Sequence, residues 1–149
     1  MTERSEEKMK TAIVYWSGTG NTETMANAVA EGVRAAGAEA EIIPAAAFDA
    51  AMLDSYDAVA FGCPSMGSEQ LEEDEFAPMF VACEPKLAGR KIALFGSYGW
   101  GDGEWMRTWE DTCRGDGATV VCDSVICCGA PDDAAAAECS ALGAALAKA

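Results

Sequence analysis

Short apolar runs alternate with longer segments of helical periodicity along most of the chain. The runs that predict strands cover residues 11–16, 41–43, 59–62, 92–97 and 119–121, the last continuing to 125–127. Between the first two runs, apolar residues recur every three or four positions from Met25 to Ala36. This spacing predicts an amphipathic helix that ends near Gly37.

Helical periodicity returns in the second half of the chain. It predicts helices over residues 76–83 and 104–113, and the Ala-rich tail predicts a closing helix over residues 132–147, with Asp132 and Asp133 suited to its start. Five strands separated by helices imply an α/β fold with a parallel sheet covered on both faces. The alternation alone leaves several doubly wound strand orders open.

A segment rich in glycine and hydroxyl residues joins the first strand to the first helix. The first N–H groups of a helix have no intrahelical partner, and the helix dipole places partial positive charge there. Glycines let the backbone approach an anion closely, and the other side chains add donors. The pattern predicts a phosphate-binding loop, with an ordinary helix-capping turn as the alternative. The segment consists of Ser17, Gly18, Thr19, Gly20, Asn21 and Thr22.

The kind of phosphate follows from motifs that this segment lacks. It does not end in the glycine of a dinucleotide fingerprint, and it has no Gly-Lys-Ser/Thr of a Walker A loop. No lysine or arginine occurs between Lys10 and Arg34. A terminal monophosphate held by neutral donors is therefore the simplest ligand.

Two later segments are also unusual in composition. In the first, Met66 offers a polarizable thioether that packs well on a planar ring, and Gly67 permits a positive φ. The alternative there is a turn at a strand end with a core methionine. In the second, Trp100 lies between glycines, which suits an indole that projects from a loop. Trp105 and Trp109 lie four positions apart on a predicted helix and are expected in the core.

These three segments, in this order, resemble the FMN-binding loops of flavodoxins, in particular the short-chain flavodoxins of anaerobic bacteria. The similar segments are residues 15–23, 62–69 and 95–103, and the resemblance covers about residues 9 to 148. It implies a flavodoxin-like three-layer, doubly wound, five-stranded parallel sheet of order 2-1-3-4-5. FMN would bind non-covalently at the topological switch point of such a sheet.

The resemblance also implies roles for individual residues. Trp100 would stack on the outer face of the flavin ring and Met66 on the inner face, and Glu69 would bond the ring at N3. The Met66–Gly67 peptide would flip on reduction, so that its carbonyl accepts a bond from N5 and stabilises the neutral semiquinone. The implied cofactor contacts are Ser17, Gly18, Thr19, Gly20, Asn21, Thr22, Pro64, Ser65, Met66, Gly67, Ser68, Glu69, Ser97, Tyr98, Gly99, Trp100 and Gly101, with no side-chain bond from Pro64 to the ribityl chain.

Composition and charge limit the number of domains, the partners and the cellular compartment that we expect. The 149 residues, half of them hydrophobic, suit one folded domain, which we expect over residues 9–149 after a disordered extension at residues 1–8. The net charge of −15 argues against nucleic acid. Seven cysteines without C-x-x-C spacing indicate reduced thiols, as in the cytoplasm. The sequence has no long apolar run and no signal peptide, so we expect a cytoplasmic protein that does not bind membranes. We also expect it to be a monomer. Histidine is absent, so we expect neither catalytic residues nor a metal site.

Acidic residues crowd the expected flavin site. Residues 69 and 72–75 and several positions from 102 to 111 are acidic, and no lysine or arginine occurs between Arg34 and Lys86. Such a field would disfavour the anionic hydroquinone, which makes it a strong reductant, and would attract basic partners. Cys127 and Cys128 are adjacent, and a vicinal disulfide is the strained alternative to free thiols there.

The leading functional hypothesis is a low-potential one-electron carrier that cycles FMN between semiquinone and hydroquinone. By family analogy, its partners would be iron–sulfur oxidoreductases and ferredoxin- or flavodoxin-type reductases. One alternative is an FMN-dependent NAD(P)H or quinone reductase of the same fold, although the chain has no second nucleotide fingerprint. Another is a phospho-accepting receiver, which would need acidic residues after the first strand and an aspartate after the third. Ser17 and Cys63-Pro64 stand there instead.

Overall fold

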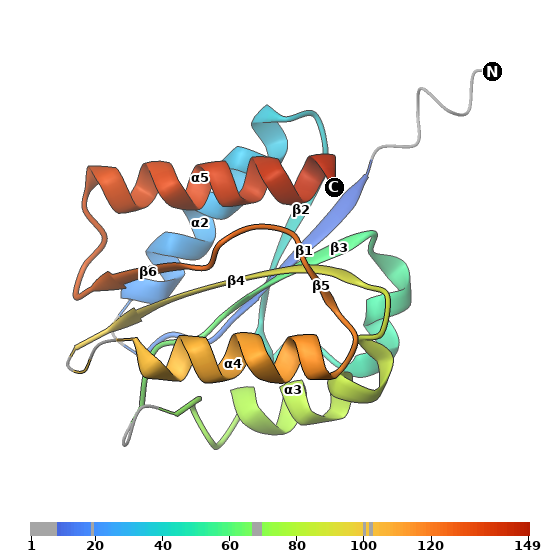
Figure 1. The fold of residues 1–149 in the computed structure, drawn as a ribbon. Coiled ribbons are helices and arrows are strands. Elements are labelled where there is room, and N and C mark those ends of the chain that lie inside the picture. Colours follow the sequence, from blue (N-terminus) through green and yellow to red (C-terminus); the bar gives the residue numbers. More distant parts are fainter. Residues whose placement is uncertain (1–8, 19, 67–69, 100, 102) are drawn as a thin grey trace.

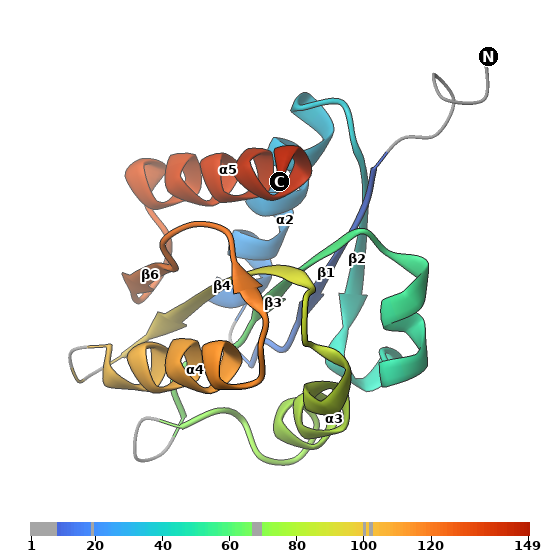
Figure 2. The same ribbon diagram turned by 45° about the vertical axis from the view of Figure 1, so that its right-hand side comes forward.

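The computed structural model describes residues 9–18, 20–66, 70–99, 101 and 103–149. The domain has three layers, with a central sheet between one pair of helices, α2 and α5, and a second pair, α3 and α4 (Figures 1 and 2). The expected disordered extension at residues 1–8 lies outside the described residues. The elements are β1 Lys10–Tyr15, α2 Asn21–Ala35, β2 Glu39–Pro44, β3 Ala58–Gly62, α3 Phe76–Cys83, β4 Lys91–Tyr98, α4 Glu104–Gly115, β5 Thr119–Val120, β6 Val125–Cys128 and α5 Asp133–Lys148.

The strand order is β2-β1-β3-β4-β5, and every strand pair is parallel. This confirms the order implied by the resemblance. The expectation of five strands needs one correction, because the last strand is split and β6 pairs with β4 separately. Ile92 pairs with Val120 and Phe95 with Val125, so three steps along β4 correspond to five along its neighbour. The two extra residues cannot be accommodated in a regular ladder, and the strand breaks there.

Alternation along β1 sends its side chains into two separate cores. Ile13 packs with the helix pair α2 and α5, whereas Ala12 and Val14 pack with the opposite pair. Helix α4 buries Trp105 and Trp109 in the second core, as the spacing predicted. The ring of Trp109 meets those of Phe76 and Phe80 edge to face, with centroids 5.4 and 5.8 Å apart.

The switch point lies between β1 and β3. After β1 the chain passes to α2 on one face of the sheet, and after β3 it passes to α3 on the other face (Figure 1). The carboxyl ends of two such strands are where ligands bind in doubly wound sheets. None of the helices among the described residues is long and apolar enough to cross a membrane.

Candidate functional site

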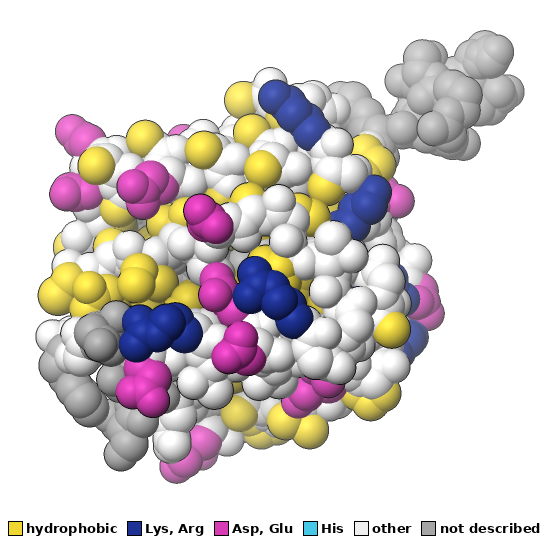
Figure 3. All heavy atoms as spheres, in the orientation of Figure 1, with side chains coloured by type: hydrophobic (Ala, Val, Ile, Leu, Met, Phe, Trp, Pro, Cys, Tyr) yellow, Lys and Arg dark blue, Asp and Glu magenta, His cyan; other side chains and the backbone are white. Residues whose placement is uncertain are grey.

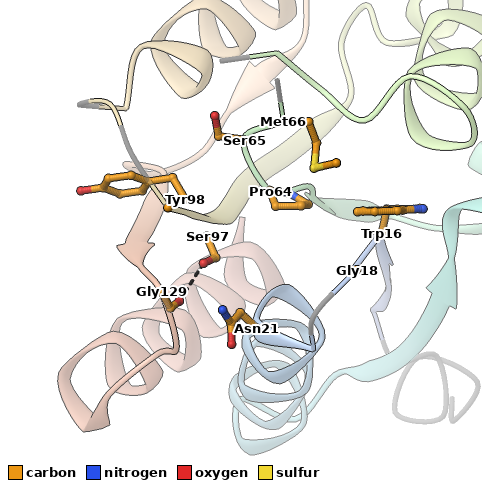
Figure 4. Close-up of a pocket in the computed structure, with 10 residues that line it drawn as sticks. Trp16, Gly18, Asn21, Pro64, Ser65, Met66, Ser97, Tyr98 and Gly129 are labelled. Atoms are coloured by element: carbon orange, nitrogen blue, oxygen red, sulfur yellow. Dashed lines mark hydrogen bonds between the residues drawn. The ribbon is translucent and has the colours of Figure 1, made fainter. Parts of the chain in front are cut away.

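A cleft of about 280 Å³ opens at this edge of the sheet (Figure 4). Four segments that are distant in sequence meet there, namely the ends of β1, β3 and β4 with their following loops, and the turn after β6. The described residues that line it are Trp16, Gly18, Asn21, Pro64, Ser65, Met66, Ser97, Tyr98, Gly99 and Gly129.

The start of α2 forms one end of the cleft. Gly20, at a φ of 98°, precedes the helix, and no side chain of a described residue caps it, so the first N–H groups have no capping partner in this part of the chain. The backbone N–H of Gly20 donates to Ser17 Oγ at 3.0 Å, which closes the turn that leads into the helix. Asn21 lines the cleft beside Gly18. This end of α2 therefore offers backbone donors and the positive end of a helix dipole to an anion.

Thr22 adds an unpaired hydroxyl in the same helical turn. The residue is 1% exposed, and its Oγ1 has no hydrogen-bond partner among the described residues. A buried hydroxyl without a partner is costly, by about 1–3 kcal/mol. A phosphate oxygen bound at the start of α2 would be a suitable acceptor for it.

The segment after β3 forms a second side of the cleft. Ser65 N–H donates to Ser97 O at 3.0 Å, which holds this segment against the end of β4. Met66 and Gln70 exchange two backbone bonds, of 2.8 and 2.9 Å, that join the ends of a short loop. The side chain of Met66 is 36% exposed, unusually high for a large apolar residue, and lines the cleft near Trp16 (Figure 4). The alternative of a core methionine is therefore wrong.

Glu72 has a structural role that the sequence did not indicate. The sequence places Glu72 among the acidic residues around the site, but in the structure it is only 5% exposed. Its carboxylate accepts the backbone N–H groups of Asp74, Glu75 and Phe76, each at 2.8 Å, at the start of α3. Burial raises the pKa of Glu72, but these three donors outweigh burial, and the net pKa is lowered. Glu72 is thus an ionised helix cap rather than a free surface charge.

Cys63 is a fully buried residue at the base of the second segment. Its N–H donates to Phe95 O at 3.1 Å, and its Sγ lies 3.4 Å from the backbone N of Glu72. Burial, with a smaller effect of the Glu72 carboxylate, raises the pKa of the Cys63 thiol to about 12. Cys63 is therefore a neutral thiol that packs as a small apolar residue.

The end of β4 and the turn after β6 form the remaining side. Ser97 Oγ donates to Gly129 O at 2.7 Å, and Gly129 N–H donates to Tyr98 O at 2.8 Å (Figure 4). Gly129 has a φ of 74°, a conformation that favours glycine. Cys127 and Cys128, nearby on β6, are both free, so the vicinal disulfide is absent.

Two lining residues, Trp16 and Gly129, were missed by the sequence reasoning. Trp16 was counted with the buried first strand, yet its indole lies over Gly18, where a Cβ would come within 3.0 Å of the ring. Gly129 follows two cysteines, and a glycine at such a position indicates a turn but not a binding residue. Of the residues named in advance, Gly18, Asn21, Pro64, Ser65, Met66, Ser97, Tyr98 and Gly99 line the cleft, and Ser17, Gly20 and Thr22 lie in the segment that joins β1 to α2 and in the first turn of that helix.

The remaining residues named in advance are not among the described lining residues. Gly101 is described, with a φ of 87°, but is not among the lining residues. Thr19, Gly67, Ser68, Glu69 and Trp100 lie outside the described residues, so their expected roles stay predictions.

Comparison with known proteins agrees with this geometry. The sequence profile of the flavodoxin family matches residues 13–143. The chain belongs to the flavodoxin family. It is 48% identical to a flavodoxin of Megasphaera elsdenii over 137 residues, covering 92% of this chain and 98% of the relative. It is 46% identical to a flavodoxin of Clostridium beijerinckii over 122 residues, covering 82% and 88%.

A solved structure shows the same architecture. The solution structure of two-electron reduced M. elsdenii flavodoxin matches with a TM-score of 0.87, covering 93% of this chain and 99% of that one. Flavodoxins bind FMN and transfer electrons, and they are not enzymes, so the cofactor is FMN and the reductase and receiver alternatives are set aside. The described residues fit this cofactor, because the uncapped start of α2 and the unpaired Thr22 hydroxyl suit its phosphate.

Proposed function

We propose that the chain is a low-potential one-electron carrier that holds FMN in the cleft described above. The start of α2 would bind the phosphate, and the segments after β3 and β4 would enclose the flavin ring. The proposed cofactor contacts are Ser17, Gly18, Thr19, Gly20, Asn21, Thr22, Pro64, Ser65, Met66, Gly67, Ser68, Glu69, Ser97, Tyr98, Gly99, Trp100 and Gly101, to which the geometry adds Trp16 and Gly129.

The observation that carries this proposal is the unpaired set of donors at the start of α2. The Thr22 hydroxyl and the first helical N–H groups would donate to phosphate oxygens without any side-chain cation. Pro64, Met66 and Tyr98 would exclude water from the ring with their apolar surfaces. Bound FMN supplies the one-electron chemistry, and the chain positions it.

Surface charge supports the low potential and the kind of partner. Glu73, Asp74 and Glu75 are exposed just before α3, and Glu73 and Asp74 line a second pocket that shares Met66 with the cleft. None of the three has an ion-pair partner in the described part of the chain. On the face in Figure 3, acidic side chains are widely spread and basic ones lie singly between them. We propose that this field favours the semiquinone over the anionic hydroquinone. It would also attract basic surfaces of iron–sulfur oxidoreductases and ferredoxin- or flavodoxin-type reductases in the cytoplasm.

A comparison of FMN with riboflavin tests the phosphate-binding assignment. Riboflavin has the same ring and lacks only the phosphate. We expect the apoprotein to bind one FMN per chain and to bind riboflavin about 100-fold more weakly, because several charge-assisted bonds are lost. Titration followed by quenching of flavin fluorescence measures both affinities. Equal affinities would contradict a phosphate site at the start of α2.

A further inference from the structure

The carbonyl of Cys63 accepts a hydrogen bond from a side chain rather than from the sheet. Trp105 Nε1, in the first turn of α4, donates to Cys63 O at 3.2 Å. Cys63 is fully buried and Trp105 is 2% exposed, so water cannot replace either group. Cys63 comes directly before the segment at 64–66 that lines the cleft. The bond therefore fixes the point from which that segment leaves β3.

Trp105 also contacts the other side of the cleft. Its ring packs against that of Tyr98, with centroids 5.5 Å apart and planes inclined at 51°. Tyr98 and Gly99, at the end of β4 and just after it, line the cleft together with the segment after β3. One side chain thus contacts both segments that would enclose the flavin ring.

The space around the Cys63 carbonyl is closely fitted. A Cβ built on Gly96 would lie 2.2 Å from Cys63 O and 3.2 Å from Trp105 Cζ2. Glycine at position 96 is therefore required for the carbonyl, the indole and β4 to approach this closely. A shift of the carbonyl would be transmitted to its neighbours, because no empty space separates them.

Trp109 shows that burial of an indole on α4 does not by itself require this bond. It lies one turn after Trp105 and is 3% exposed, yet no described residue accepts a hydrogen bond from its Nε1. Its ring packs edge to face against Phe76 and Phe80, away from the residues that line the cleft. The two tryptophans lie on the same helix and are buried to the same degree, but of the two only Trp105 has an acceptor for its indole N–H among the described residues.

We propose that Trp105 is a positioning residue for the cofactor site, holding the segments at 64–66 and 98–99 at the spacing that FMN needs through its N–H bond to Cys63 and its contact with Tyr98. This inference rests on the proposed function and adds a residue that does not itself line the cleft. Without the indole N–H, the buried Cys63 carbonyl would lack a partner and would rotate toward one. The segment at 64–66 would then move relative to β4.

The test compares Trp105→Phe with Trp109→Phe, which makes the same change on the same helix. The first measurement is amide hydrogen exchange in the apoprotein at Ser65 and Met66, whose N–H groups bond to Ser97 and Gln70. We expect exchange there to be about tenfold faster in Trp105→Phe, the size of effect that an unpaired buried carbonyl produces. The N–H of Trp16, which bonds to Gly62 O, serves as an internal reference and should not change.

The second measurement is made with FMN. We expect Trp105→Phe to bind FMN about tenfold more weakly and to shift both one-electron reduction potentials, whereas Trp109→Phe keeps the affinity and potentials of the unaltered protein. A third protein carries 3-benzothienylalanine at position 105, which keeps the ring size and replaces the N–H by sulfur. It should behave as Trp105→Phe does, and it covers the case in which the smaller ring prevents folding.

The outcomes separate the two proposals. If exchange at Ser65 and Met66 and the affinity for FMN are the same in Trp105→Phe and Trp109→Phe, Trp105 only fills space and the inference is wrong. If the benzothienyl protein behaves like the unaltered one, the N–H bond is not what positions the segment, and the inference is likewise overturned. If the unaltered protein binds no FMN, the proposed function fails, and the exchange comparison still decides the role of the bond.

Discussion

Thr11 and Thr22 both bury a hydroxyl that finds no hydrogen-bond partner in the described part of the chain, and each is 1% exposed. Their positions differ. Thr11 lies near the start of β1, at the end of the strand opposite to the cleft, whereas Thr22 lies in the first turn of α2, beside the cleft. The same chemical group is therefore expected to cost stability at both positions and to contribute to binding at one.

The change Thr22→Val tests this at the scale of a single residue. Valine has the shape of threonine without the hydroxyl. We expect the affinity for FMN to fall about tenfold, since a bond to a charged group is worth roughly 1.5–3 kcal/mol, while the affinity for riboflavin stays the same. The apoprotein should become no less stable, because a buried unpaired hydroxyl is removed. Fluorescence titration and thermal unfolding of the apoprotein measure the two effects.

Thr11→Val is the matched control. It should have the same effect on apoprotein stability and none on the affinity for FMN. An equal loss of FMN affinity in both variants would mean that the Thr22 hydroxyl does not bind the phosphate.

At the scale of elements, helices α2 and α5 approach each other through glycine. A Cβ on Gly143 of α5 would lie 2.1 Å from Val29 O of α2, and one on Gly32 would lie 1.9 Å from Ser140 O. Both obstacles are backbone atoms, which cannot rotate away as a side chain can. The two helices therefore lie closer together than any larger residue at these positions would permit.

We expect Gly143→Ala to destabilise the protein by about 2 kcal/mol. The clash with a backbone atom puts overpacking at the upper end of its usual range of roughly 1–3 kcal/mol, and helix propensity regains only about 1 kcal/mol. Gly115→Ala, at the exposed end of α4 where no atom lies within 4 Å of the new Cβ, should instead be neutral or stabilising. Urea unfolding of the two apoproteins measures the difference. A stabilised Gly143→Ala would show that the helices separate at little cost.

At the scale of the whole molecule, the net charge of −15 makes any close pair of carboxyl groups unfavourable when both are ionised. Glu84 and Asp116 form such a pair between the end of α3 and the end of α4. Burial, then the hydrogen bond to and repulsion from Asp116, raise the pKa of Glu84 to about 7. Both groups also lie at helix C-termini, where negative charge is disfavoured.

The raised pKa means that the folded protein holds a proton that the unfolded chain releases at a lower pH. Stability is therefore greatest below the ordinary pKa of a glutamate, 4.5, and falls as the pH rises through about 7, as far as this pair is concerned. Glu84→Gln keeps a neutral hydrogen-bond donor at every pH. We expect the variant to melt at a higher temperature than the unaltered apoprotein at pH 8, with the difference narrowing toward pH 5.

Glu31→Gln, at an exposed position on α2, removes the same charge away from Asp116. Its melting temperature should follow that of the unaltered protein at both pH values, apart from a small uniform shift. If the two variants show the same pH dependence, general charge repulsion rather than the Glu84–Asp116 pair is responsible.

Local sequence determined the elements of this protein and the donor-rich composition of the segment at 17–22. The helix over residues 76–83 has the bounds that were predicted, and Trp105 and Trp109 lie in the core as their spacing required. These features depend on periodicity and on side chains a few positions apart, which any segment carries with it. The glycine and hydroxyl residues at 17–22 are also neighbours in sequence, so their pattern can be recognised without the fold.

Tertiary structure alone decided which distant residues meet. Glu72 reads as one more surface carboxylate, and it became a buried cap because α3 begins just after it. Trp16 and Gly129 face the same cleft, and the Trp105 indole bonds to Cys63 across 42 positions of sequence. The break between β5 and β6 likewise follows from the length of β4 opposite. Such contacts are set by strand order and by the packing of side chains between layers, and neither leaves a periodic signal in the residues that make them.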